Sequence, residues 1–480
     1  MKSASQKLSV REKLGYSLGD SAANFIFQTM IIFQLNFYTD TFGITAAAAG
    51  TLLLVARVWD AIFDPMMGAI ADRTNTRWGK FRPWILWTAL PFGIMAFLTF
   101  STPGFSGGGK LVYAYVTYIA LMMIYSANNL PYSALSGVMT GDMVERTSLS
   151  SYRFVFAMLA QFVVQGLALP MVAMFGQGDT AKGYQFTIGI FSILAVVFFL
   201  VTFSSTKERI KPPPQQKTSI KQDFADLFKN GPWIAMFFVT LLVFIHLSMR
   251  GGVLLYYFKY YMNEASMLKL LESVGLGGRL VDKDVAGMAF SVFNVCGTTA
   301  MIIGILFSKM LAKQYGKRNV YIVGLAGTTL ITIFFISLGP ESVLLTFISQ
   351  IMYGLIYGIT IPLLWAMMAD VADFSEWKNK RRATGIVFSA VVFGLKAGLG
   401  FGGAIGGYVL SAYGYVPNVE QTTEAILGIR MTISIFPAIA FIGALIALAY
   451  YKIDKKMEYT IQDELAERRK SFQEESPEKT

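Results

Sequence analysis

Cysteine and histidine are almost absent from this chain of 480 residues, which has one of each, Cys296 and His246. A single cysteine excludes an internal disulfide and a cysteine-based zinc site. A lone histidine cannot build a multi-histidine metal centre or a Ser/His/Asp triad, so its role is either structural hydrogen bonding or proton relay. We therefore expect a protein that is not an enzyme and has no resident cofactor or metal centre.

Charged side chains are scarce as well, at 15% of the residues against 54% apolar ones, and the mean hydropathy is +0.51. Apolar runs without any charge, such as Ile188–Phe203, approach the length that crosses a hydrocarbon core of about 30 Å. These features predict an all-α integral membrane protein whose partner is the lipid bilayer. The net charge of +11 resides mainly in short loops, which indicates membrane topology and not nucleic-acid binding.

Apolar blocks separated by charged or Gly/Pro-rich stretches predict twelve transmembrane helices in two halves of six. The predicted centres lie near residues 27, 56, 93, 125, 161, 194, 245, 298, 328, 357, 398 and 438. The widest gap is rich in lysine and proline and is predicted to be a cytoplasmic loop. The expected parts are an N-terminal half (1–204), the central loop (205–231), a C-terminal half (232–452) and a charged cytoplasmic tail (453–480).

The distribution of lysine and arginine among the loops predicts the orientation. The connections near Thr39, Pro340 and Gly414 contain neither residue, whereas three other loops are strongly basic. Basic loops stay in the cytoplasm, so both termini are expected there. Two six-helix halves, a basic central loop and cytoplasmic termini describe the major facilitator fold, in which substrate binds between the halves near the middle of the membrane. The basic loops contain Arg73, Arg77, Lys80 and Arg82; Lys309, Lys313, Lys317 and Arg318; and Lys378, Lys380, Arg381 and Arg382.

Ionisable residues inside the predicted spans require an explanation, because each costs roughly 3 kcal/mol or more at the bilayer centre unless it is paired or hydrated. Arg57, Asp60 and Asp64 are spaced so that they share one helical face. Two carboxylates one turn apart can share a monovalent cation or a proton. The alternative is a static cluster whose carboxylates merely neutralise Arg57.

Further polar and aromatic residues in the spans are candidates for substrate contact, each with a structural alternative. Lys396 is either a countercharge to the carboxylates or is buried against carbonyl groups. Arg250 is either a substrate contact or part of a structural pair. Asn129 offers hydrogen bonds to a polyhydroxylated ligand or to a neighbouring helix, and Trp365 offers a ring to a sugar or to helix packing.

Three segments carry a resemblance to a known family. They are LVARVWDAIFDP at Leu54–Pro65, RWGKFRP at Arg77–Pro83 and ADVADFSE at Ala369–Glu376. The chain resembles the glycoside–pentoside–hexuronide:cation symporters of the major facilitator superfamily, which include the melibiose carrier. The resemblance implies secondary active import of a sugar or glycoside with Na⁺, H⁺ or Li⁺ by alternating access.

The resemblance also implies roles for individual residues. Asp60, Asp64 and Ser126 match the cation-binding positions, beside which Arg57 and Lys396 would balance charge. Ser133 and Ile361 stand where the melibiose carrier has tryptophans, so the sugar is expected to differ from melibiose. The implied substrate-binding set is Asn24, Asn129, Arg153, Trp365 and Arg250, and the implied cytoplasmic gate between the halves is Arg146, Asp370, Asp373 and Arg382.

The sequence thus predicts a symporter of the bacterial cytoplasmic (inner) membrane that acts as a monomer on a small sugar or glycoside. Two alternatives remain open at this point. One is a symporter for hexuronides or other anionic sugars, and the other is a membrane sensor that binds a sugar without transporting it.

Overall fold

The computed structural model describes residues 7–140, 143–209, 229–278, 281, 283–379 and 384–474. Within these ranges the chain is helical, with one isolated β-bridge between Thr76 and Gly79 and no strand. The N-terminal half contains α1 (Val10–Asn36), η1 (Phe37–Thr41), α2 (Ala46–Arg73), α3 (Arg82–Thr99), α4 (Gly108–Met139), α5 (Met143–Gly176) and α6 (Thr180–Ser205).

The C-terminal half repeats this pattern of long helices and adds short ones. It contains α8 (Gly231–Tyr260), α9 (Glu264–Ser273), α10 (Val285–Tyr315), α11 (Lys317–Phe334), η2 (Phe335–Ser337), α12 (Val343–Asn379), α13 (Thr384–Ala412), α14 (Thr423–Ile433), α15 (Ile435–Ala449) and α16 (Lys455–Glu474). Each of the twelve predicted spans corresponds to one long helix, the last of which is divided into α14 and α15 at Ser434. The twelve-helix prediction is therefore confirmed.

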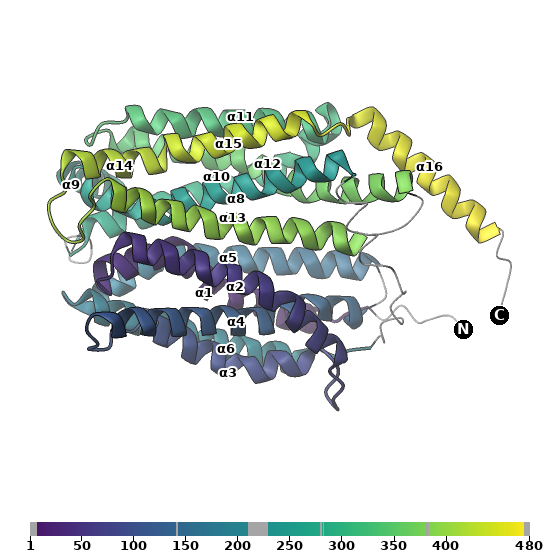
Figure 1. Cartoon of the computed structure of the whole chain (residues 1–480), viewed down its shortest axis with the longest axis horizontal. Helices are drawn as coiled ribbons and strands as arrows, with labels where there is room; N and C mark the ends of the chain where they lie inside the picture. The colour runs from purple at the N-terminus through teal and green to yellow at the C-terminus, as the bar shows by residue number, and fades with distance from the viewer. Residues whose placement is uncertain are drawn as a thin grey trace.

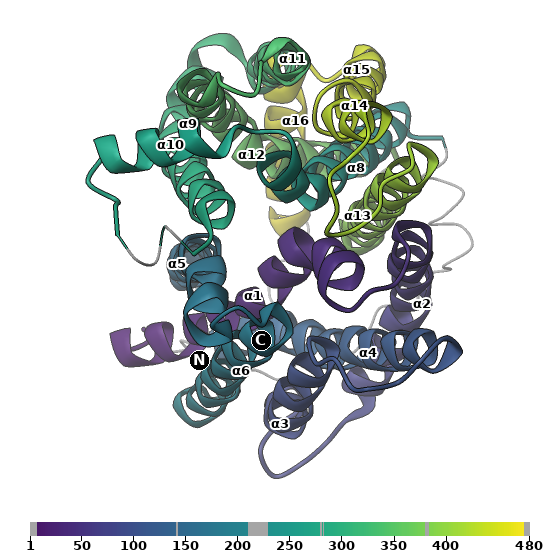
Figure 2. The same ribbon diagram turned by 90° about the vertical axis from the view of Figure 1, so that its left-hand side faces the viewer.

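The helices run nearly parallel to one long axis and form two groups (Figure 1). An end-on view shows α1 to α6 on one side and α8 to α15 on the other, with α2 beside α13 and α5 beside α10 where the groups meet (Figure 2). The first turn of α1, which pairs with the first turn of α5, and helix α16 lie at the same end of the molecule, which we call the termini end. The opposite end, where α1 finishes and α9 lies, is called the Asp40 end.

Side-chain caps begin several of these helices where the sequence changes from loop to apolar run. Asp179 accepts a hydrogen bond from the Lys182 N–H at the start of α6, and Asn230 accepts one from the Trp233 N–H at the start of α8. Such caps satisfy backbone donors that have no partner in the first helical turn. They fix where these two helices enter the bundle.

Glycines allow helices to touch through their backbones. A Cβ at Gly354 of α12 would lie 2.2 Å from the Gly297 carbonyl oxygen of α10, and one at Gly407 of α13 would lie 2.5 Å from the Ala46 carbonyl oxygen of α2. Small residues produce such contacts in membrane helices because they permit close approach. The α2–α13 contact joins the two halves, so the halves meet here through direct backbone contact between two helices.

Candidate ion-binding and sugar-binding site

The predicted cation-binding residues meet on α2 and α4 of the N-terminal half, and the predicted charge-balancing residue Lys396 approaches them from α13 of the C-terminal half. Ser126 of α4 donates a hydrogen bond of 2.5 Å to Oδ1 of Asp60 on α2. The Lys396 ammonium of α13 lies 3.0 Å from Oδ2 of Asp60 and also contacts Oδ2 of Asp64. Asp60 is fully buried, and Asp64 is mostly buried. We call these residues, together with Arg57, the ion cluster.

Arg57 completes the charge balance of the ion cluster. Its Nη1 lies 3.9 Å from Oδ2 of Asp60, and its guanidinium faces the ring of Phe27 at 5.9 Å. Two carboxylates thus face two cationic side chains. Oδ1 of Asp64 is buried and accepts no hydrogen bond from any residue that the structure describes, so the cluster retains unused acceptor capacity among the oxygen ligands that hard cations prefer.

A second polar group lies between α1, α4 and α5, closer to the termini end. Arg153 of α5 donates hydrogen bonds to both carboxylate oxygens of Asp20 on α1, at 2.5 Å and 3.2 Å. The Tyr132 hydroxyl of α4 donates to the same carboxylate at 3.0 Å. The rings of Tyr16 and Tyr132 stack on each other, and their centroids lie 5.5 Å and 5.0 Å from the central carbon of the guanidinium. These four residues are called the Arg153 group.

Asn24 and Asn129 lie on the helices that form the Arg153 group. Asn24 is one turn after Asp20 and donates to its backbone carbonyl at 2.9 Å. The Asn129 amide donates to the Tyr125 hydroxyl at 3.1 Å. Both asparagines, like Arg153, are partly exposed. They remain open to a ligand that offers hydroxyl groups.

Helix α4 connects the two polar groups directly. Ser126 belongs to the ion cluster, Tyr132 belongs to the Arg153 group, and Asn129 lies between them on successive turns of one helix. Tyr125 also stacks on Phe27 at 5.6 Å, and Phe27 is the ring that faces Arg57. A shift of α4 at Ser126 would therefore also move Asn129 and Tyr132.

Two residues that the sequence singled out lie apart from these groups. Arg250 is only 5% exposed; it donates to the Gln350 side chain at 3.0 Å and packs between the rings of Phe335 and Tyr353. His246 is bonded through its two ring nitrogens to the Pro437 carbonyl and the Tyr353 hydroxyl, both at 2.9 Å. These contacts match the structural alternative for each residue.

Trp365 of α12 is 42% exposed. Within the described residues, no ring contact or hydrogen bond joins it to the Arg153 group. The structure therefore does not bring this tryptophan to the other predicted sugar contacts.

Two residues of the implied gate, Asp370 and Arg146, have partners within their own half among the described residues. Asp370 pairs with Lys317 of α11 at 2.6 Å, and Lys317 also pairs with Glu458 of α16 at 2.9 Å, all within the C-terminal half. Arg146 donates to the backbone carbonyls of Thr140 and Gly137 in the N-terminal half. Asp373 lies one turn after Asp370 on α12, and Arg382 lies outside the described residues.

A polar cluster that the sequence did not predict joins the halves at the Asp40 end. The buried Asp40 carboxylate lies 2.5 Å from the Lys259 ammonium, accepts a hydrogen bond of 2.6 Å from the Tyr260 hydroxyl and accepts another from the Tyr415 hydroxyl. Asn418 donates to the Asp40 backbone carbonyl at 2.6 Å. We call these five residues the Asp40 cluster.

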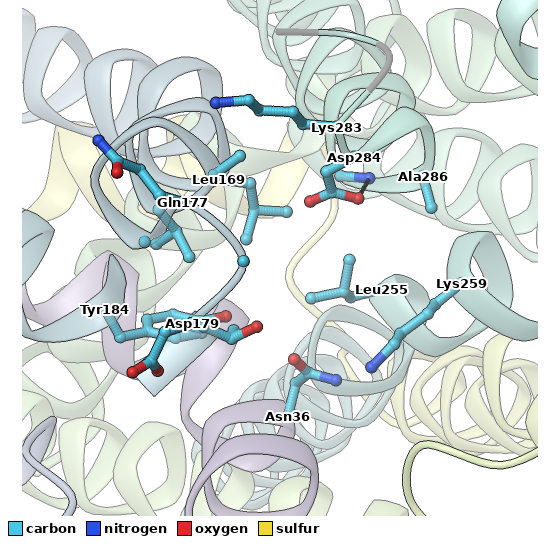
Figure 3. Close-up of a pocket in the computed structure, with 16 residues that line it drawn as sticks. Asn36, Leu169, Gln177, Asp179, Tyr184, Leu255, Lys259, Lys283, Asp284 and Ala286 are labelled. Atoms are coloured by element: carbon cyan, nitrogen blue, oxygen red, sulfur yellow. Dashed lines mark hydrogen bonds between the residues drawn. The ribbon is translucent and has the colours of Figure 1, made fainter. Parts of the chain in front are cut away.

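The Tyr415 phenol of the Asp40 cluster is kept protonated by its surroundings. Burial, together with the Asp40 carboxylate, raises the pKa of the Tyr415 phenol, so the phenol remains a hydrogen-bond donor. Beside the cluster, a cavity of about 610 Å³ lies between the halves and is lined by Asn36, Tyr184, Lys259 and Asp284 among others (Figure 3). The lysine that binds Asp40 thus also faces this cavity.

Comparison with known proteins identifies the family. The family model for MFS/sugar transport proteins matches residues 15–281 and 283–455. This chain belongs to that family. Its relatives confirm the resemblance to the glycoside–pentoside–hexuronide:cation symporters, so this MFS symporter is a membrane transporter and not an enzyme.

Two relatives of the sugar-transport family align with this symporter over nearly all of their length. The inner membrane symporter YicJ of Escherichia coli is 35% identical over 98% of this chain and 97% of its own. The isoprimeverose transporter of Lactiplantibacillus pentosus is 36% identical over 92% of this chain and 89% of its own.

Solved structures of major facilitator transporters share the fold of this symporter. A mutant of the nucleoside transporter NupG has a TM-score of 0.61 at 15% identity and covers 92% of this chain and 100% of its own. A D-xylose–proton symporter has a TM-score of 0.57 at 14% identity, and the match covers 92% of this chain and 96% of that symporter. At such identities the likeness concerns the fold alone, and it confirms the predicted fold class.

Proposed function

We propose that this protein couples import of a neutral sugar or glycoside to a monovalent cation, with Na⁺ as the first ion to test and Li⁺ and H⁺ as alternatives. The observation that carries the proposal is the ion cluster, in which Asp60, Asp64 and Ser126 present convergent oxygen atoms beside Lys396. A cation entering there competes with the ammonium of Lys396 for the carboxylates. Displacement of Lys396 changes the contact between α2 and α13, which belong to opposite halves.

Coupling to the sugar follows from the position of α4. Because this helix contributes to both the ion cluster and the Arg153 group, a cation that fixes Ser126 also fixes Asn129 and Tyr132. If the cation raises the affinity for sugar, the sugar raises the affinity for the cation by the same factor. We propose that sugar binds at Asn24, Asn129 and the Arg153 group, whose exposed donors and acceptors suit hydroxyl groups.

The charge of the Arg153 group favours a neutral substrate. Arg153 is already paired with Asp20 through two hydrogen bonds, so an anionic sugar would have to compete with a carboxylate that is fixed in the protein. The isoprimeverose transporter is among the most similar relatives, at 36% identity, and a glucuronide carrier protein homolog is 32% identical. We therefore propose a neutral glycoside, in preference to a hexuronide, as the substrate.

A counterflow screen in proteoliposomes tests the substrate proposal. Labelled neutral pentosides and glycosides should exchange across the membrane in the presence of Na⁺, whereas glucuronides should exchange at least about tenfold more slowly, which corresponds to about 1.4 kcal/mol. Exchange of glucuronides alone would reject the neutral-sugar proposal. Sugar binding without any counterflow would indicate the sensor alternative.

We further propose that the termini end faces the cytoplasm of a bacterial inner membrane and that the structure is an inward-facing state. At the opposite end, the Asp40 cluster joins the two halves. Nearer the termini end, Arg153, Asn24 and Asp64 are partly exposed. The basic loops predict the same orientation.

Single cysteines in a Cys296→Ser background test this orientation. Ser106→Cys lies in the α3–α4 connection at the Asp40 end and should react with an impermeant thiol reagent in intact cells. Thr76→Cys lies in the α2–α3 connection and should react only after the membrane is permeabilised. Labelling of Thr76→Cys in intact cells would reverse the orientation.

A further inference from the structure

A separate cavity of about 800 Å³ lies at the termini end, between the first turns of α1 and the last turn of α6. Its lining contains no residue of the ion cluster or of the Arg153 group, although Gly15 and Leu18 in that lining lie on either side of Tyr16 on α1. Its lining combines cationic, hydroxyl-bearing and aliphatic side chains. The residues that matter here are Arg11, Leu14, Leu18, Val201, Lys207 and Arg209.

The rim of this cavity has an excess of positive charge. Arg209 is paired with Glu12 through two hydrogen bonds, at 2.7 Å and 2.9 Å, so these two charges cancel. Arg11 and Lys207 are exposed, and in the described part of the chain neither side chain forms an ion pair. Two cations therefore remain available to an anionic ligand.

Part of the lining of the cavity is aliphatic. Leu14 and Val201 are 38% and 37% exposed, and both belong to long helices of the membrane bundle. The floor is fixed because the Thr202 hydroxyl donates to the Gly15 carbonyl at 2.8 Å, and because a Cβ at Gly15 would lie 2.0 Å from Oγ of Ser205. The cavity thus has a cationic rim above exposed aliphatic side chains.

We propose that this cavity binds an anionic phospholipid, with the phosphate between Arg11 and Lys207 and the acyl chains along Leu14 and Val201. Guanidinium and ammonium groups form charge-assisted hydrogen bonds with phosphate oxygens, and basic pockets at the cytoplasmic side of membrane helices suit lipid headgroups. The aliphatic wall favours a lipid over free phosphate. This inference is independent of the sugar and of the coupling ion.

The test uses the full-length protein in nanodiscs of the zwitterionic lipid phosphatidylcholine. Phosphatidylglycerol is titrated into these nanodiscs, and native mass spectrometry counts the lipids that stay bound to the protein. The wild type should retain phosphatidylglycerol in preference to phosphatidylcholine. The double variant Arg11→Gln, Lys207→Gln should bind phosphatidylglycerol about thirtyfold more weakly, since each cation near the surface contributes about fivefold. Arg11→Lys, which keeps the charge, should retain most of the binding.

A matched control removes two exposed lysines at the Asp40 end, Lys182→Gln and Lys283→Gln, and should leave phosphatidylglycerol binding unchanged. Melting temperatures in pure phosphatidylcholine show whether the variants are folded. Equal loss in the control pair, or unchanged binding in the Arg11, Lys207 pair, would overturn the assignment. Displacement of the lipid by millimolar inorganic phosphate would likewise overturn it in favour of a soluble phosphate ligand.

Discussion

Asp60→Asn is expected to abolish cation-stimulated sugar binding and uptake, with a loss of about a hundredfold or more. The substitution leaves one carboxylate facing Arg57 and Lys396, and removing one member of a buried charge pair costs about 3–5 kcal/mol. A further cation would then enter a site that is already positive. Calorimetric titration of sugar with and without Na⁺, together with uptake into energised vesicles, measures the loss.

The control for this variant is Asp179→Asn, an exposed helix cap outside the ion cluster, which should keep full coupling. Asp60→Asn should still bind sugar weakly without cation, because Asn24, Asn129 and Arg153 are unchanged. Asp64→Asn should lose coupling in the same way. Retention of full cation-dependent accumulation in both variants would show that the coupling ion binds elsewhere.

Asp40→Asn is expected to favour opening of the Asp40 end. An amide cannot form the ion pair with Lys259, and it weakens the bonds from the Tyr260 and Tyr415 hydroxyls that hold the halves together. Because Lys259 is partly exposed, we expect a shift of about tenfold and not the full cost of a buried pair. The shift should appear as faster labelling of Leu255→Cys, a buried position in the adjacent cavity.

The labelling experiment uses a Cys296→Ser background and, as the matched control, Glu424→Gln, an exposed carboxylate in the first turn of α14 that does not line this cavity. The labelling rate of this control should equal that of the parent. Melting temperature separates a shift between conformations from loss of folding. If Asp40→Asn does not change the labelling rate, the Asp40 cluster is not what keeps this end closed.

The sequence predicted the fold and singled out Asp60 and Asp64 because both inferences rest on local signals. Apolar runs of helical length predict each span, and charges at Asp60 and Asp64 within such a run are conspicuous. The sequence did not identify Asp20 as a site residue, because the first half of α1 contains other polar and charged residues, among which one carboxylate is not unusual. Its partner, Arg153, lies 133 residues away, and no periodicity connects them.

The Asp40 cluster could not be predicted for a related reason. Asp40 comes directly after an apolar helix, where an acidic loop residue is ordinary, and its partners Lys259 and Tyr415 are 219 and 375 residues away. Only the packing of the two halves brings them together. Arg250 is the reverse case, in which the sequence suggested a site residue. Its charge in an apolar span made it a candidate for substrate contact, but its side chain is hydrogen-bonded to Gln350 and packed against two aromatic rings within one half.

The balance of two carboxylates and two cationic side chains in the ion cluster has an electrical consequence. Under the coupling proposed above, two carboxylates balance two cationic side chains when no ion is bound, so the empty protein would reorient without moving charge through the transmembrane field. With a bound Na⁺ the same movement would transfer one positive charge, worth about 2.3 kcal/mol per 100 mV. The membrane voltage would then act on the loaded step, and transport currents should vary with sugar and ion together while the empty return step stays electrically silent.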